Sequence, residues 1–260
     1  MANYLRRILS IETPGLGRVI TTILCIPYDD IPDVIGRTLT IYNTIGEDGA
    51  VDLVEYISQI PKERRDFIME EAKRLYNKDM NAISKGHLIR GLSKIATEDF
   101  NDIVTLGREL FLDNTQGGHM SLILNNLEKS IKKDMRSDFV KQVKVLLKPT
   151  DTSMIRNNII CTLSKFSEEH RKIFLKLMPS SISTETTEKV FDSLHFITYI
   201  DIQFRENDKA EEQKLIGRFI NYYQDNLARH EIVSEEKFLT TTLSAIQYAK
   251  MKLLYTAEDR

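Results

Sequence analysis

The stretch Ile57-Ser-Gln-Ile60-Pro61 is the second of five versions of one short phrase in this chain. The other four versions are Ile23-Leu-Cys-Ile26-Pro27, Leu92-Ser-Lys-Ile95, Leu127-Glu-Lys-Ser-Ile131 and Leu163-Ser-Lys-Phe166. Their first residues stand at 23, 57, 92, 127 and 163, so the intervals are 34, 35, 35 and 36 residues. Near-equal spacing of this length is typical of proteins built from tandem structural repeats.

The similarity continues after each phrase, with one inserted residue in the fourth unit. An apolar residue is followed four positions later by a mostly small one, and three positions after that by another apolar one. This i, i+4, i+7 spacing predicts an amphipathic helix. In the fifth unit Pro179 ends the helix early. The three sets are Val34, Ile68, Ile103, Phe139 and Phe174; Thr38, Ala72, Gly107, Val143 and Met178; and Ile41, Leu75, Leu110 and Leu146.

Each unit is therefore predicted to be a helix, a tight turn and a second helix. Thr97 and Ser167, each followed by two acidic residues, are the expected N-caps of two second helices. A unit of two helices cannot bury its apolar face alone, so neighbouring units must stack. The alternative is an irregular bundle with chance periodicity. The predicted first helices are 16–26, 49–60, 82–96, 119–131 and 152–166, and the second are 31–43, 62–76, 98–112, 133–147 and 168–178.

The repeat phrase is absent from the last 80 residues or so, where three longer helices are predicted at 185–206, 209–229 and 235–256. This segment holds ten of the chain's 21 aromatic residues. They form either the core of a capping bundle or, in part, an exposed binding patch. Because Tyr222 and Tyr223 are adjacent on one helix, we expect one of them to be exposed. The ten are Phe191, Phe196, Tyr199, Phe204, Phe219, Tyr222, Tyr223, Phe238, Tyr248 and Tyr255.

The predicted fold is thus all-α. Residues 1–179 form a right-handed α-solenoid of about five two-helix repeats, each of 34–36 residues. Residues 180–260 form a three-helix C-terminal bundle that packs on the last repeat.

Composition indicates an ordinary soluble protein, with 42% hydrophobic and 28% charged residues and a net charge of −2. Two cysteines provide no disulfide framework, which favours a reducing compartment and a cytoplasmic location. No segment has the length and apolar character of a signal peptide or of a membrane span. The near-neutral charge argues against a dedicated nucleic-acid binder.

The sequence contains no recognisable catalytic motif. Its five histidines are scattered without zinc-ligand spacing, and neither a P-loop nor Gly-x-Ser-x-Gly occurs. Cys161 lies on an apolar stretch with no neighbouring base, so we expect it to be a buried structural residue. We therefore predict a protein that is not an enzyme and needs no metal or cofactor. An enzyme whose site is assembled across repeats stays an alternative.

Charge is unevenly distributed among the predicted second helices. Helix 98–112 is acidic overall, whereas 132–148 and 168–178 carry many basic residues. Equivalent helices lie side by side in a solenoid, so these residues could form a basic strip for an acidic peptide, a phosphoinositide head group or a nucleic-acid backbone. The alternative is an ordinary solvated face. The strip comprises Lys132, Lys133, Arg136, Lys141, Lys144, Lys148, Arg171, Lys172 and Lys176.

The segment Ile57-Ser-Gln-Ile-Pro61-Lys-Glu-Arg64 is similar to the degenerate Leu-x-x-Ile-Pro-x-x-x-Arg helical repeats of secreted effectors of intracellular bacteria. The unit length also resembles HEAT and tetratricopeptide repeats, although the Trp, Gly, Tyr and Pro pattern of the latter is absent. The resemblance covers residues 16–178 and implies a host-directed binding protein acting in the host cytosol, with no catalytic residues. The function predicted is a non-enzymatic scaffold that binds a protein or peptide, with the basic strip and Tyr222 and Tyr223 as candidate contacts.

Overall fold

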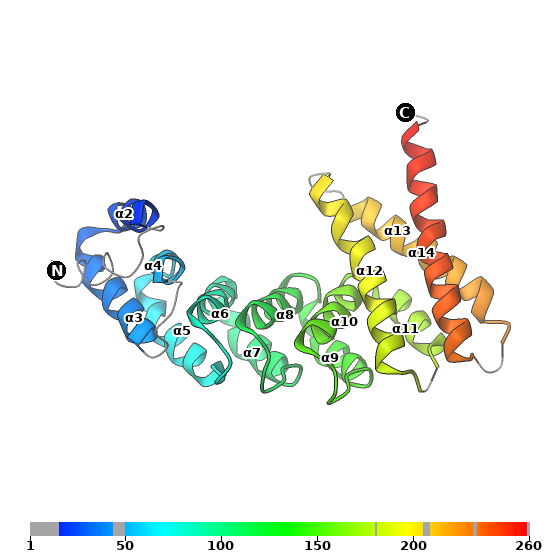
Figure 1. Ribbon diagram of the computed structural model, residues 1–260, viewed down its shortest axis with the longest axis horizontal. Helices are drawn as coiled ribbons and strands as arrows, with labels where there is room; N and C mark the ends of the chain where they lie inside the picture. The colour runs from blue at the N-terminus through cyan, green and yellow to red at the C-terminus, as the bar shows by residue number, and fades with distance from the viewer. Residues whose placement is uncertain (1–15, 44–49, 180, 205–208, 231–232, 259–260) are drawn as a thin grey trace. The chain divides into compact units, whose positions relative to one another are not determined.

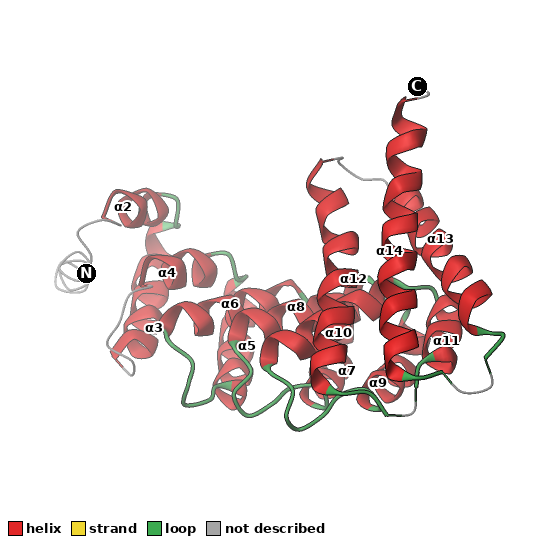
Figure 2. Ribbon diagram, turned by 45° about the vertical axis from the view of Figure 1, so that its right-hand side comes forward, coloured by secondary structure: helices red, strands yellow, loops and turns green. Residues whose placement is uncertain are grey.

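The computed structural model describes residues 16–43, 50–179, 181–204, 209–230 and 233–258. Within these residues the chain is all-helical and contains no strand, which confirms the predicted all-α class (Figures 1 and 2). No described helix combines the length and the apolar character that crossing a membrane requires.

Every predicted helix is present, and the helix ends differ from the predicted ones by a few residues. In the N-terminal half the helices are α2 (Leu16–Leu24), α3 (Ile31–Asn43), α4 (Ala50–Ser58), α5 (Lys62–Leu75), α6 (Ala82–Lys94), α7 (Phe100–Arg108) and α8 (Gly117–Lys129). They are followed by α9 (Arg136–Lys144), α10 (Ser153–Lys165), α11 (Glu168–Leu177), α12 (Thr184–Phe204), α13 (Lys209–Leu227) and α14 (Glu235–Glu258).

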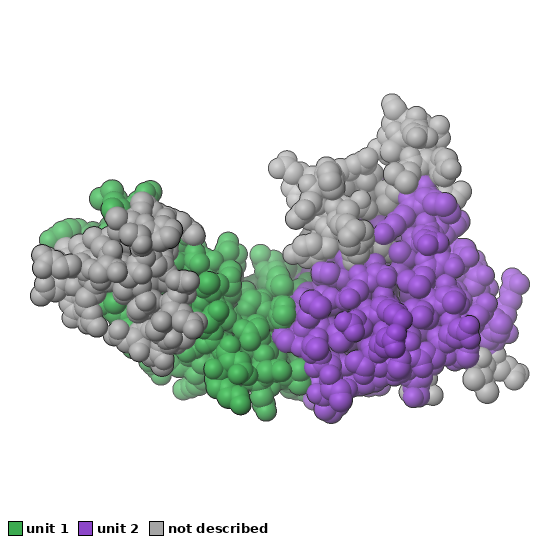
Figure 3. Space-filling view, in the orientation of Figure 1, with its two compact units in different colours: residues 1–129 green, residues 130–260 purple. Residues whose placement is uncertain are grey.

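The chain divides into two compact units, residues 1–129 and residues 130–260, which are called unit 1 and unit 2 below (Figure 3). This division separates α8 from α9. The boundary predicted at 179/180 was placed where the repeat phrase disappears, not where contacts are sparse, and it stays a prediction.

In unit 1 the first helices of consecutive repeats pack in series. Helix α6 contacts both α4 and α8, while α5 packs on α6 and α7 packs on α8. Close approach between α6 and α8 depends on glycine. The Gly117 N–H donates a 2.7 Å hydrogen bond to Ser84 Oγ, and a Cβ on Gly117 would lie 1.9 Å from the Ser84 carbonyl oxygen. A Cβ on Gly91 would lie 2.8 Å from the Cα of Ser121.

In unit 2, α12 packs on α10, α13 packs on α11, and α14 contacts both α12 and α13. An aromatic cluster around Phe174 of α11 joins these helices. The ring of Phe174 lies 5.2–6.1 Å, between centroids, from five other rings, so aromatic packing accounts for much of this core. The five are Phe166, Phe191, Phe219, Tyr223 and Phe238.

Burial follows the repeat pattern position by position. The apolar residue that opens the second-helix stripe is at most 1% exposed in all five repeats, and the last apolar residue of each phrase is at most 7% exposed. The first position of the predicted stripe is therefore confirmed in every repeat, whereas Leu146 and Met178 at its later positions are only half-buried and Leu110 and Leu146 follow the ends of α7 and α9. The first set is Val34, Ile68, Ile103, Phe139 and Phe174, and the second is Ile26, Ile60, Ile95, Ile131 and Phe166.

The local signals at helix starts were partly correct. Ser167 caps α11 by accepting a hydrogen bond from the His170 N–H at 3.2 Å, as predicted. The prediction for Thr97 was wrong, because Thr97 begins a short 3-10 turn, Thr97–Asp99, that precedes α7 and has no side-chain cap. Similar turns, Tyr28–Asp30 and Lys133–Met135, precede α3 and α9.

Gly117→Ala provides a test of the contact between α6 and α8. We expect this substitution to destabilise the protein by about 1–3 kcal/mol, because the methyl group would meet the Ser84 backbone and no flexible side chain could move aside. Gly118→Ala is the matched control, since a Cβ at Gly118 meets nothing within 4 Å. It should leave stability unchanged or raise it by up to about 1 kcal/mol, because alanine favours helix. Chemical denaturation measures both, and equal midpoints would contradict the expectation.

Candidate functional site

The residues of the predicted basic strip differ in their exposure to solvent. Lys132, Lys133, Lys141, Lys144, Lys172 and Lys176 are exposed, and all belong to unit 2. Lys148 is half-buried and its ammonium donates a hydrogen bond to the Ile182 carbonyl. Arg136 and Arg171 are only 4% and 3% exposed. The surface available to a partner therefore consists of the six exposed lysines.

The guanidinium of buried Arg171 binds backbone carbonyl groups. It donates hydrogen bonds to the carbonyl oxygens of Phe166, at 2.5 Å, and Leu163, at 3.4 Å. Its charge also lies over the ring of Phe139, 5.1 Å from the centroid. Arg171 thus satisfies carbonyl groups at the end of α10 and is unavailable to a ligand.

Acidic neighbours reduce the field of the exposed lysines. Lys141 forms an ion pair with Asp138 at 3.2 Å, and Lys172 pairs with Glu168 at 2.5 Å. The hydrogen bond from Lys172 lowers the pKa of Glu168, so that carboxylate stays charged at neutral pH. Ion pairs of this exposed kind contribute little stability, but they offset part of the positive charge that a polyanion would meet.

One of the two adjacent tyrosines is buried and the other is half-exposed, so the expectation that one is exposed is met in part. Tyr223 is fully buried in the Phe174 cluster, where burial raises the pKa of its hydroxyl. Tyr222 is half-exposed and stacks on Tyr248 of α14 at 5.0 Å between centroids. Only Tyr222 is placed to meet a partner. The side chains of Phe196, Tyr199, Phe204 and Tyr255 lie outside those that the structure describes.

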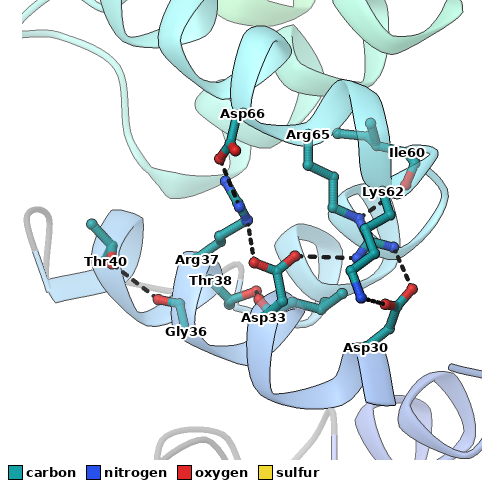
Figure 4. Close-up of polar contacts among 11 residues, drawn as sticks. Asp30, Asp33, Gly36, Arg37, Thr38, Thr40, Ile60, Lys62, Arg65 and Asp66 are labelled. Carbon is teal, nitrogen blue, oxygen red and sulfur yellow. Dashed lines mark hydrogen bonds and ion pairs between the residues drawn. The ribbon is translucent and has the colours of Figure 1, made fainter. Parts of the chain in front are cut away.

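A buried arginine also organises unit 1, at a point that the sequence analysis did not single out (Figure 4). Arg65 of α5 is 3% exposed and donates from Nε to the Ile60 carbonyl at 3.0 Å. Its two terminal nitrogens contact the carboxylates of Asp33, at 3.2 Å, and Asp30, at 3.1 Å. Lys62 approaches the other oxygen of Asp30 at 3.0 Å. This network ties α5 to the start of α3.

A second polar arrangement borders an open depression of about 640 Å³ in unit 1. It lies where α5 and α7 end. Arg74 contacts one carboxylate oxygen of Glu71 at 3.2 Å, and Arg108 contacts the other. Glu71 is itself buried, whereas the side chains of Arg74 and Arg108 are 68% and 46% exposed. A buried carboxylate therefore holds two exposed guanidinium groups at one rim. We call this depression the α5–α7 groove.

Half of the residues that line the α5–α7 groove are apolar or aromatic. Leu75 and Met120 are buried, and Tyr76 and Phe111 are half-buried. The Tyr76 ring also carries a cation, because the Lys85 ammonium lies 4.7 Å from its centroid. Burial lowers the pKa of Lys85 and raises that of Tyr76. The lining of the groove thus combines positive charge with apolar surface.

Sequence reasoning missed this groove because the charges of the predicted helix 98–112 sum to a negative value. The acidic residues Glu98, Asp102 and Glu109 are exposed, but the groove uses only Arg108 from this helix. No linear pattern indicates that Arg108 and Arg74, which are 34 residues apart, share one carboxylate.

Cys161 is 4% exposed, and its thiol lies 3.3 Å from Asn157 Oδ1, so its predicted burial is confirmed. Cys25 is exposed. In the part of the chain that the structure describes, no three His, Cys, Asp or Glu side chains gather as metal ligands would.

Comparison with known proteins found no match. No family model, no curated protein and no solved structure is significantly similar to this chain.

The Arg65 network leads to a prediction about acid stability. Hydrogen bonding to Lys62 and Arg65 lowers the pKa of Asp30 below its ordinary value of 3.8. The charged carboxylate therefore stabilises the fold above about pH 4, and this contribution is lost as the pH falls through the lowered pKa. Asp30→Asn should lower the unfolding midpoint at pH 7, and the difference from the unsubstituted chain should shrink at pH 2–3.

The neighbouring Asp29→Asn is the control, because Asp29 is exposed and outside the network. Thermal unfolding followed by circular dichroism between pH 2 and pH 7 measures both variants. A difference for Asp30→Asn that stays constant over this range would show that its charge is not what the network uses.

Proposed function

We propose that this protein is a non-enzymatic scaffold whose two-helix repeats stack in a right-handed α-solenoid and hold a protein or peptide partner. The observation that carries the proposal is the serial packing of α4, α6 and α8 in unit 1, together with burial that recurs at the same repeat positions in both units. Helices that pack in series bury one face against their neighbours and leave an extended surface, as in repeat proteins that bind other proteins.

The similarity of residues 57–64 to the repeats of secreted bacterial effectors supports a host protein as the partner. A host-directed scaffold would act in the host cytosol, where exposed Cys25 and buried Cys161 stay reduced. Such a scaffold acts by recruiting its partner to a location in the cell or by covering the partner's surface, and it catalyses no reaction.

The solenoid arrangement has a measurable consequence in solution. A compact protein of 260 residues has a radius of gyration of about 18 Å. We expect small-angle X-ray scattering of the monomer to give a clearly larger value, with a maximum dimension to match, because a solenoid lengthens with each repeat. A radius near 18 Å at several concentrations would contradict the solenoid and favour an irregular bundle.

Partner binding is tested by placing a photo-crosslinking amino acid at exposed positions and recovering host proteins. We would place it at Lys78 in unit 1, at Lys144 on the lysine surface of unit 2, and at Thr240 on α14, all of which are exposed. One protein crosslinked repeatedly at one of these surfaces supports the scaffold. Absence of any enriched protein at all three surfaces would overturn it.

A second candidate function is binding of an anionic lipid or nucleic acid by the six exposed lysines. Their exposure and their common place in unit 2 favour it, while the Asp138 and Glu168 ion pairs oppose it. Lys141→Glu with Lys144→Glu reverses charge without touching Lys148, whose contact with Ile182 is structural. If the strip binds polyanions, this variant should lose at least tenfold in affinity for phosphoinositide vesicles or for duplex DNA.

Lys214→Glu with Lys237→Glu is the matched control, because both lysines are exposed in unit 2 but lie outside the strip. Vesicle sedimentation and fluorescence anisotropy with duplex DNA measure binding at several salt concentrations. An equal loss in both double variants would indicate attraction to net charge alone, and no loss in either would remove the strip from consideration.

A further inference from the structure

We propose that the α5–α7 groove binds an acidic peptide segment in which a carboxylate side chain is flanked by a large apolar one. This inference rests on the proposed function as a scaffold and names the chemistry of the partner. Its evidence comes from unit 1 alone, and it does not involve the predicted basic strip.

The paired arginines are the first observation. Glu71 is buried, and each of its carboxylate oxygens contacts one guanidinium, so Arg74 and Arg108 are held side by side. A guanidinium has five N–H donors, and one contact with Glu71 leaves most of them directed elsewhere. Both side chains are substantially exposed and line the groove. The two long side chains are therefore partly ordered before a ligand binds, so binding costs less side-chain entropy.

The balance of charge at the rim is the second observation. Arg74, Lys78 and Arg108 line the groove, and Asp113 is the acidic residue among the described lining residues. Glu71 offsets one arginine, so the charge around the groove is positive by about one unit, with Lys78 exposed. A planar carboxylate fits two guanidinium forks, since each fork can donate two parallel hydrogen bonds.

The apolar part of the lining favours a peptide over a simple anion. Among the residues that line the groove with the arginines, Tyr76, Phe111 and Leu112 are half-buried and leave aromatic and aliphatic surface exposed. Inorganic phosphate would leave this surface in contact with water, whereas a leucine or phenylalanine side chain next to the carboxylate would cover it. A nucleic acid would need a longer track of cations than three side chains supply. The open form of the depression suits a chain that lies across it, since small-molecule sites usually enclose most of their ligand.

Fluorescence anisotropy on the full-length chain tests this proposal. The probe is a fluorescein-labelled nonapeptide of alternating glutamate and leucine, and the matched probe has glutamine at each glutamate position. We expect a dissociation constant in the micromolar range for the acidic probe and at least tenfold weaker binding of the neutral one. Competition by inorganic phosphate at millimolar concentration should be weak. Equal binding of the two probes, or full displacement by phosphate, would overturn the proposal.

Three variants locate the binding. Arg108→Gln should weaken binding of the acidic probe about tenfold or more, because it removes a charge-assisted contact. Lys78→Glu should weaken it several-fold, and no described contact of Lys78 is broken by this change, so folding is not at risk. Lys237→Glu in unit 2, which is exposed and lies outside the basic strip, is the matched control and should bind like the unsubstituted chain. Unchanged affinity in both groove variants would exclude this site.

The result of the peptide-binding test can be distinguished from the result of the crosslinking test of the scaffold. If the acidic probe does not bind but photo-crosslinking captures one protein through α14 or the lysine surface, the groove proposal fails and the scaffold stands. If the probe binds and crosslinking at Lys78 captures a protein whose contact region is acidic and apolar, both stand. Failure of every crosslinking position overturns the scaffold, while peptide binding is still decided by the anisotropy.

Discussion

The tight turn between the two helices of a repeat imposes the main constraint on this fold. A buried apolar residue follows the end of each first helix by one or two positions, so carbonyl groups there lose water and need another donor. Arginine supplies it in three repeats: Arg65 donates to Ile60, Arg64 donates to Ile95 of the next repeat, and Arg171 donates to Phe166. The long side chain crosses the turn and keeps its charge near carbonyl oxygens, acids or an aromatic ring. These arginines therefore stabilise the fold. Counting every arginine in the sequence as a surface charge overestimates the positive charge that a partner can reach.

The distance between the first helices of neighbouring repeats also determines which side chains of their second helices can contact one another. Gly91 and Gly117 let α6 and α8 approach until backbone nearly meets backbone. A Cβ on Gly107 would lie 2.6 Å from the Leu124 side chain of α8, so this glycine lets α7 pack closely on the same helix. This close packing brings the end of α7 within reach of α5, where Glu71 and Arg108 meet. Close packing of α7 on α8 at Gly107 therefore helps to determine where Arg108, the next residue, lies.

The sequence predicted the helices and their buried stripes well, because both follow from periodic apolar residues. Val34, Ile68, Ile103, Phe139 and Phe174 are all buried, as the i, i+4, i+7 spacing required. Charged residues were harder to place, since a periodic pattern says which face is apolar but not how far a long side chain reaches back. Arg136 and Arg171 looked like surface cations, although each follows a buried phrase residue by five positions. Arg65 stands at the same spacing after Ile60, and this shared spacing was a usable signal.

The exposed basic side chains of the two units differ in how they are paired with acids. In unit 2, Lys141 and Lys172 each have an acid three or four residues away on their own helix, so local pairing reduces their effect on a ligand. In unit 1, Arg74 and Arg108 share an acid that is itself buried, which fixes their positions while their exposed edges stay accessible. Exposed lysines that pair with acids of their own helix would attract many anions weakly, whereas two arginines held by one buried carboxylate beside apolar side chains would favour ligands of matching shape. Selective recognition is therefore better supported at the α5–α7 groove than at the more basic helices.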